Sequence, residues 1–79
     1  MTTIFVIDEK TGKVERTCAY SVGPKKAIVN YIMQYIKNNW DTWQYPEYIK
    51  GVRQSIKAPD HYYYDDIPNG KIIAAYPNN

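Results

Sequence analysis

The sequence predicts a two-layer α+β domain in which a four-stranded antiparallel sheet carries its helices on one face. Two pairs of short β-branched or aromatic runs, one at each end of the chain, favour hairpins, since a glycine-containing turn separates the members of each pair. The stretch between the pairs, residues 23–56, has apolar residues at helical spacing in two segments. A length of 79 residues suits one domain, 1–79.

The first predicted hairpin joins a strand over residues 3–7 to a strand over residues 14–20. Gly12 in the connecting turn can adopt the positive φ that a type I turn with a G1 bulge requires. The resulting register has three facing pairs: Ile4 with Cys18, Val6 with Arg16, and Asp8 with Val14. Both faces of this hairpin carry apolar residues, so the sequence leaves open which face meets the helices.

An amphipathic helix over residues 23–38 is the predicted centre of the domain. It begins at Gly23-Pro24, because proline is preorganised for the first helical position. The apolar side chains cover an arc of roughly 200°, which is wide enough to be buried against more than one element. Ile32 lies in the middle of that arc and is predicted to be among the least accessible residues. The arc consists of Ile28, Val29, Tyr31, Ile32, Met33, Tyr35 and Ile36.

A shorter second helix is predicted over residues 46–56. Pro46 suits its start, and an apolar stripe follows at Ile49, Val52 and Ile56. The segment between the two helices contains Trp40 and Trp43, for which burial in the core and exposure on a binding surface are both open.

The last predicted hairpin joins strands over residues 61–66 and 71–76. Pro68 and Asn69 suit the centre of a type I turn with Gly70 as the bulge residue. That register gives a predicted core face of Tyr62, Tyr64, Ile72, Ala74 and Tyr76. A two-residue type I′ turn at Asn69-Gly70 would slip the pairing, and the sequence leaves this alternative open. The slipped register groups Tyr63 with Ile67, Ile72 and Tyr76.

Composition places the chain among folded, soluble proteins. It is 44% hydrophobic and 15% aromatic, which is too apolar for a disordered chain. One cysteine excludes an intrachain disulfide and suits a reducing cytoplasm. We see neither a basic signal-peptide start nor an apolar run of about 18 residues, and therefore expect a cytoplasmic protein without a membrane span.

The sequence carries no motif for catalysis. Cys18 and His61 are the only candidate thiol–imidazole pair, and nothing near either residue supplies the context of a nucleophile. Asp60, His61, Asp65 and Asp66 could be imagined around a metal, but a strand would point Asp65 and Asp66 to opposite faces. A glycine-rich phosphate loop and a nucleophile elbow are both absent from the sequence. We predict no enzymatic activity, no cofactor and no metal.

Aromatic and basic residues mark a predicted partner surface. Trp, Tyr and Arg are the types enriched at the energetic centres of protein interfaces. The predicted surface consists of Trp40, Trp43, Tyr63, Lys50, Arg53 and Lys57. Our leading hypothesis is a non-enzymatic protein that blocks or modulates a larger protein partner. The alternative is a nucleic-acid-binding module, in which the basic face of the second helix contacts phosphates and the aromatics stack on bases.

The order of elements resembles small accessory proteins of phages and mobile elements, including some anti-CRISPR proteins. The resemblance is carried by Ile4-Phe5-Val6-Ile7, by residues 17–21, by Lys26-Ala27-Ile28 and by the closing run 71–76. It implies a phage-encoded inhibitor that binds a CRISPR-Cas nuclease complex in a bacterial host, without catalysis. Many such proteins are strongly acidic nucleic-acid mimics, and the net charge of +2 departs from that type. Since a four-stranded sheet leaves two strand edges, we also expect a homodimer.

Overall fold

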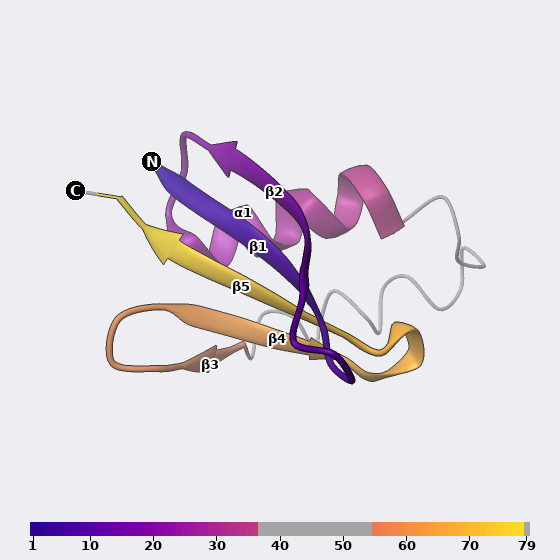
Figure 1. Ribbon diagram of the computed structural model, residues 1–79. Coiled ribbons are helices and arrows are strands. Elements are labelled where there is room, and N and C mark those ends of the chain that lie inside the picture. Colours follow the sequence, from indigo (N-terminus) through magenta and orange to yellow (C-terminus); the bar gives the residue numbers. More distant parts are fainter. Residues whose placement is uncertain (37–54, 79) are drawn as a thin grey trace.

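The computed structural model describes residues 1–36 and 55–78 (Figure 1). Five strands form one antiparallel sheet in the order β2-β1-β5-β4-β3. An α-helix, α1, continues directly into a π-helical turn, η1, and a short 3₁₀ turn, η3, links β4 to β5. In chain order the elements are β1 (Thr2–Asp8), β2 (Val14–Tyr20), α1 (Pro24–Tyr31), η1 (Ile32–Ile36), β3 (Ile56–Lys57), β4 (Tyr62–Asp66), η3 (Ile67–Asn69) and β5 (Lys71–Pro77).

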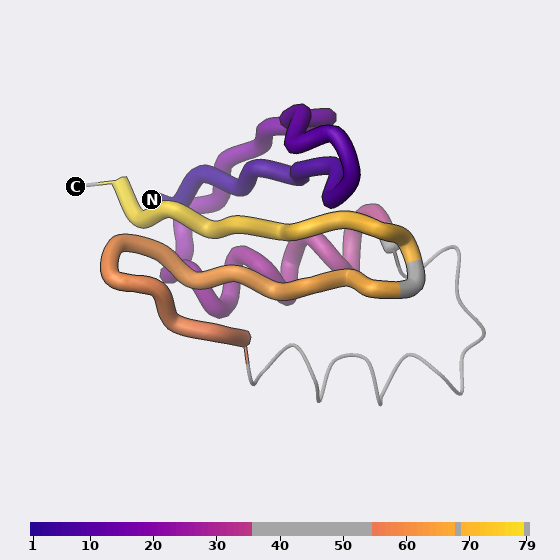
Figure 2. The backbone as a smooth tube through the Cα atoms, turned by 60° about the horizontal axis from the view of Figure 1, so that its bottom comes forward, coloured from indigo at the N-terminus to yellow at the C-terminus, as the bar shows by residue number. Residues whose placement is uncertain are grey.

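The helix lies against one face of the sheet, and the core lies between these two layers (Figure 2). Side chains alternate along a strand, so every second residue of β1 and β5 faces α1. Ile28 and Ile32 of the helical segment are fully buried there. The core cluster consists of Ile4, Val6, Ala27, Ile28, Tyr31, Ile32, Ile73 and Ala75.

The central position of β1 explains its uniformly apolar sequence. It pairs with β2 on one side and with the C-terminal strand β5 on the other. Ile4 and Val6 are buried in the core under α1, and Phe5 and Ile7 on the other face are half-buried, so an apolar residue suits each position of the run. The two ends of the chain therefore meet, and the backbone N–H of Asn78 donates to the carbonyl oxygen of Met1 at 2.8 Å.

The predicted four-stranded sheet with a long and a short helix is wrong. The fifth strand, β3, pairs Ile56 with Tyr63 and Lys57 with Tyr62. The prediction had placed Ile56 at the end of the second helix, because its apolar spacing fits a helix. Instead, residues 56 and 57 pair with the edge of β4 that β5 does not occupy. Residues 46–54 of that predicted helix lie outside the described residues, and Ser55 precedes β3 without helical structure.

The predicted long helix begins where expected, but its second half is a π-helical turn instead of an α-helix. Gly23 is the N-cap residue and Pro24 opens α1, as predicted. After Tyr31 the chain forms the π-helical turn, whose wider hydrogen-bonding spacing breaks the 3.6-residue period. Met33 is consequently 47% exposed, although the helical arc had placed it with the buried residues. Residues 37 and 38 of the predicted helix lie outside the described residues.

The first hairpin follows the predicted register over most of its length. Ile4 faces Cys18 and Val6 faces Arg16, as predicted. The predicted pairing of Asp8 with Val14 is wrong, because the register shifts between Val6 and Ile7 and Val14 pairs with Ile7. The shift leaves an extra residue in β2, which is a β-bulge. Gly12 has the predicted positive φ, at 72°.

The second hairpin differs from its predicted register by one residue. Asp66 pairs with Lys71, so the loop spans the four residues 67–70, with Gly70 at a φ of 65°. A slip of one residue moves every side chain of β5 to the other face relative to β4. Tyr62 and Tyr64 do border the core, as predicted, but their partners there are Ile73 and Ala75. The opposite face carries Tyr63 together with Ile72, Ala74 and Tyr76. This agrees with the grouping of Tyr63, Ile72 and Tyr76 in the type I′ alternative, except that Ile67 lies in the 3₁₀ turn.

Candidate docking face of the sheet

The second face of the sheet points away from α1, and we call it the open face. Strand alternation and the observed register assign its members. They are Thr3, Phe5 and Ile7 of β1, Val14, Thr17 and Ala19 of β2, Ile72, Ala74 and Tyr76 of β5, Tyr63 and Asp65 of β4, and Ile56 of β3.

Four rings gather on the open face and form an aromatic cluster of Phe5, His61, Tyr63 and Tyr76. Phe5 and Tyr76 meet edge to face, with centroids 5.5 Å apart. His61 stacks on Tyr76 at 4.3 Å with an interplanar angle of 12°, and it lies 5.9 Å from the ring of Tyr63. All four residues are half-buried, so each remains partly accessible to a partner.

A small residue forms the floor of the cluster. Ala74 pairs with Phe5 of β1 on one side and with Tyr63 of β4 on the other. Although it points away from the helix layer, Ala74 is only 2% exposed. The neighbouring rings therefore enclose this position, and the strands fix the spacing between them.

A shallow apolar groove continues from the aromatic cluster towards β2. Its volume is about 540 Å³, and it is lined by Thr3, Phe5, Ile7, Val14, Tyr76 and Asn78. Val14 is 53% exposed at its far end. The amide Nδ2 of Asn78 donates to Oγ1 of Thr3 at 2.7 Å, which fixes the end of the groove nearest the two chain termini.

Charge is nearly absent from the open face. Among the described strands, its only Asp, Glu, Lys or Arg residue is Asp65. Beside the cluster, Asp60 contacts Nδ1 of His61 at 2.7 Å, and this hydrogen bond lowers the pKa of the Asp60 carboxyl. The basic residues of the strands, Arg16, Lys57 and Lys71, alternate onto the helix side. The described strands therefore offer aromatic contact without cations on this face.

The structure separates the two predicted surface residues that it describes. Tyr63 pairs with Ile56 and belongs to the open face, whereas Lys57 pairs with Tyr62 and belongs to the helix side. They do not form one surface. The other predicted surface residues, Trp40, Trp43, Lys50 and Arg53, lie outside the described residues.

Three members of the aromatic cluster were not predicted as surface residues. Phe5 and Tyr76 share a face only in the observed pairing of β1 with β5, which joins the two ends of the chain. The grouping of Tyr76 with Tyr63 was present in the type I′ alternative for the second hairpin. His61 gave no local signal, because its position follows from stacking on Tyr76.

The candidate chemical groups are not assembled. Cys18 packs against the core on the helix side, whereas His61 stacks with the rings of the open face. Asp65 and Asp66 alternate to opposite faces of β4, as predicted. Within residues 1–36 and 55–78 no three His, Cys, Asp or Glu side chains lie together in a way that could hold a metal ion. In those same ranges no helix has the length and apolar character needed to cross a membrane.

Comparison with protein-family models, with curated proteins and with solved structures gives no match for this chain.

Proposed function

We propose that this protein is a non-enzymatic binding protein whose open face docks onto a larger protein partner and blocks or modulates it. The observation that carries the proposal is the aromatic cluster on a sheet face that α1 does not cover. Aromatic side chains present a large contact area with few rotatable bonds, which keeps the entropic cost of docking low. Strands β1, β4 and β5 hold these rings in place before a partner arrives.

The electrostatics of the open face favour a protein over a nucleic acid. Binding to a phosphate backbone depends on Lys and Arg side chains that displace counterions. The described part of the open face has no Lys or Arg beside its rings. Depletion of charge around aromatic anchors is instead typical of the centre of a protein interface.

The resemblance to accessory proteins of phages adds a kind of partner to this proposal. Such a protein would act in the bacterial cytoplasm by occluding the surface of a CRISPR-Cas nuclease complex. Occlusion needs only a rigid face of sufficient affinity, which fits the strand-mounted cluster. It also requires no catalytic group.

A capture experiment with matched variants tests the proposal. Val14→Lys places a charge at the exposed end of the apolar groove, and Met33→Lys places one at a similarly exposed position on the helical segment. We expect the wild type and Met33→Lys to capture the same protein from bacterial host lysate, and Val14→Lys to lose it. Equal capture by all three proteins, at equal thermal midpoints, would contradict docking through the open face.

A second candidate function, nucleic-acid binding, is supported by a different observation on the helix side. The Nζ atom of Lys25 lies 5.5 Å from the centroid of Tyr62, and Lys57 is the cross-strand partner of Tyr62. Tyr62 thus has one lysine ammonium near its ring and a second lysine on the neighbouring strand. Proteins that bind single strands combine an aromatic ring, which stacks on a base, with cations that contact the phosphates. A mobility shift of single-stranded DNA or RNA at low salt, lost in a Lys25→Gln/Lys57→Gln variant, would support this second function. Failure of the wild-type protein to shift either strand would exclude it.

A further inference from the structure

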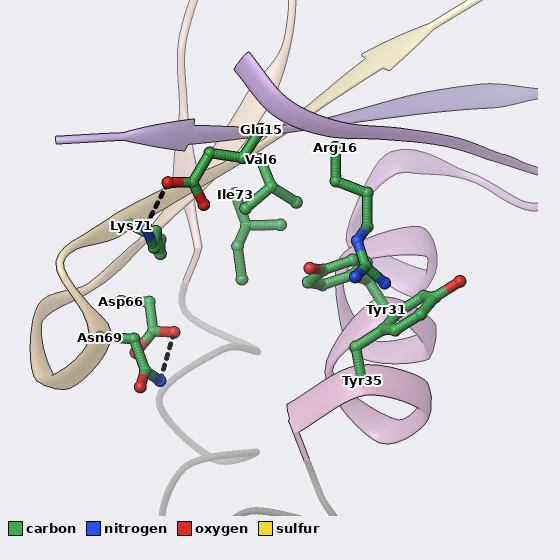
Figure 3. Close-up of a pocket in the computed structure, with 9 residues that line it drawn as sticks. All are labelled: Val6, Glu15, Arg16, Tyr31, Tyr35, Asp66, Asn69, Lys71 and Ile73. Carbon is green, nitrogen blue, oxygen red and sulfur yellow. Dashed lines mark hydrogen bonds and ion pairs between the residues drawn. The ribbon is translucent and has the colours of Figure 1, made fainter. Parts of the chain in front are cut away.

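A hollow of about 380 Å³ lies on the helix side of the sheet, away from the open face (Figure 3). Val6 and Ile73 form an apolar floor, and Tyr31 and Tyr35 of the helical segment line one side. Four charged residues surround it, namely Glu15, Arg16, Asp66 and Lys71. The hollow therefore combines an apolar floor with a charged rim.

Two of these charged residues neutralise each other. The ammonium of Lys71 contacts Oε1 of Glu15 at 2.5 Å and Oδ2 of Asp8 at 3.3 Å. The Glu15 hydrogen bond raises the pKa of Lys71, so this side chain is protonated and held at the rim. Neither Glu15 nor Lys71 needs a further partner.

The other two charged residues have no ion-pair partner within the described residues. The guanidinium of Arg16 lies over the ring of Tyr35, 4.1 Å from its centroid. Asp66 is 1% exposed; its Oδ2 atom accepts a hydrogen bond from Nδ2 of Asn69 at 2.9 Å. Its Oδ1 atom is buried and has no hydrogen-bond partner among the described residues.

Leaving a buried carboxylate oxygen without a donor is costly, and such groups in folded proteins nearly always have a partner. A ligand that brings a donor to Asp66 removes that cost, and a cationic donor also supplies a counter-charge that the described residues do not provide. Figure 3 shows Arg16 on the opposite side of the hollow from Asp66, where it can receive an anionic group. The apolar floor between them suits an aliphatic stem.

We propose that this hollow binds a small zwitterion, with its ammonium at Asp66 and its carboxylate at Arg16. The class includes amino acids in which an aliphatic chain separates the two charges. The inference is independent of the proposed docking function, since the hollow and the open face lie on opposite sides of the sheet.

Titration of the full chain by amide chemical shifts tests the proposal. The probes are glycine, 4-aminobutanoate and 6-aminohexanoate, which differ in the separation of their charges, with butanoate and butylamine as one-charge controls. We expect one zwitterion to shift amides around Val6 and Ile73 and to bind more tightly than either control. A charged hydrogen bond at each end corresponds to about a 10- to 100-fold change in Kd.

Three variants assign the two ends of the probe. Asp66→Asn should weaken the zwitterion and butylamine but leave butanoate unchanged, and Arg16→Gln should weaken the zwitterion and butanoate only. Lys13→Gln is the matched control, because this exposed lysine does not line the hollow, and we expect its zwitterion Kd to be unchanged. Since Arg16 is exposed, its variant keeps the test valid even if Asp66→Asn fails to fold. The proposal is overturned if no zwitterion binds up to its solubility, or if Arg16→Gln and Lys13→Gln affect binding equally.

Discussion

Asp8 links the turn of the first hairpin to the last strand. Its Oδ1 atom accepts hydrogen bonds from the backbone N–H groups of Lys10 and Thr11, both at 2.9 Å. Its Oδ2 atom accepts one from Nζ of Lys71 at 3.3 Å. These hydrogen bonds lower the pKa of Asp8 from 3.8 to about 2, and the largest effect comes from Thr11, with Lys71 next.

This lowered pKa predicts a loss of stability in acid. The folded state holds the Asp8 carboxylate ionised at a pH where the unfolded chain binds a proton, so the contribution is complete above pH 3.8 and is lost as the pH falls towards 2. Asp8→Asn keeps an acceptor oxygen but removes the charge. Melting curves should show a smaller decrease in Tm between these pH values for the variant than for the wild type. Parallel decreases in the two proteins would show that Asp8 does not contribute.

Gly70 has a left-handed backbone conformation, which residues with a Cβ rarely adopt. Its φ is 65°, and its N–H closes the turn by donating to the carbonyl of Ile67 at 3.1 Å. Apart from the adjacent residues, no atom lies within 4 Å of the position that a Cβ would occupy there. The cost of Gly70→Ala is therefore conformational, roughly 1–2 kcal/mol of unfolding free energy. Gly70→Asn should cost less, since Asn visits the left-handed region more readily. Chemical denaturation measures both, and equal losses would contradict this explanation.

Local turn chemistry was the part of the fold most readily predicted from single residues. The positive φ values of Gly12 and Gly70, and the helix start at Pro24, depend on backbone restrictions of the residues themselves. Such restrictions act within a few positions of the chain. They can therefore be read without knowledge of tertiary contacts.

At the scale of elements, the junction of α1 and η1 separates two neighbouring apolar side chains. Ile32 is fully buried, whereas Met33 is 47% exposed. Ile32→Ala should lower the free energy of unfolding by about 2–5 kcal/mol, because it leaves a cavity in the core. Met33→Ala should change it by about 0.5 kcal/mol or less. Thermal melts with equal midpoints for the two variants would contradict the observed orientation of this segment.

The errors in the predicted elements come from choices that local sequence does not determine. The Pro68-Asn69-Gly70 segment suits both a three-residue and a four-residue loop, and that single residue decides which face of β5 meets the helix. Ile56 fits the apolar stripe of a helix, yet its backbone pairs with Tyr63. Both outcomes depend on contacts with another strand, which a period in the sequence does not report.

At the scale of the whole molecule, the pairing of β1 with β5 produces the candidate docking face. It brings Phe5 of the N-terminal strand to Tyr76 of the C-terminal strand. The sequence predicted an aromatic binding surface that includes Tyr63, and this stays a prediction. Which rings lie beside Tyr63 depends on the long-range pairing of β1 with β5. The predicted homodimer stays a prediction, and β2 offers the longer of the two edge strands.

Side-chain footprinting of the free protein and of its captured complex tests the docking face most directly. Hydroxyl radicals modify accessible aromatic and sulfur-containing side chains, so one experiment reports on both sides of the molecule. We expect Phe5, Tyr63 and Tyr76 to lose reactivity in the complex, while Met33, on the helical segment, keeps it. Protection of Met33 with unchanged reactivity at Tyr63 and Tyr76 would contradict docking through the open face.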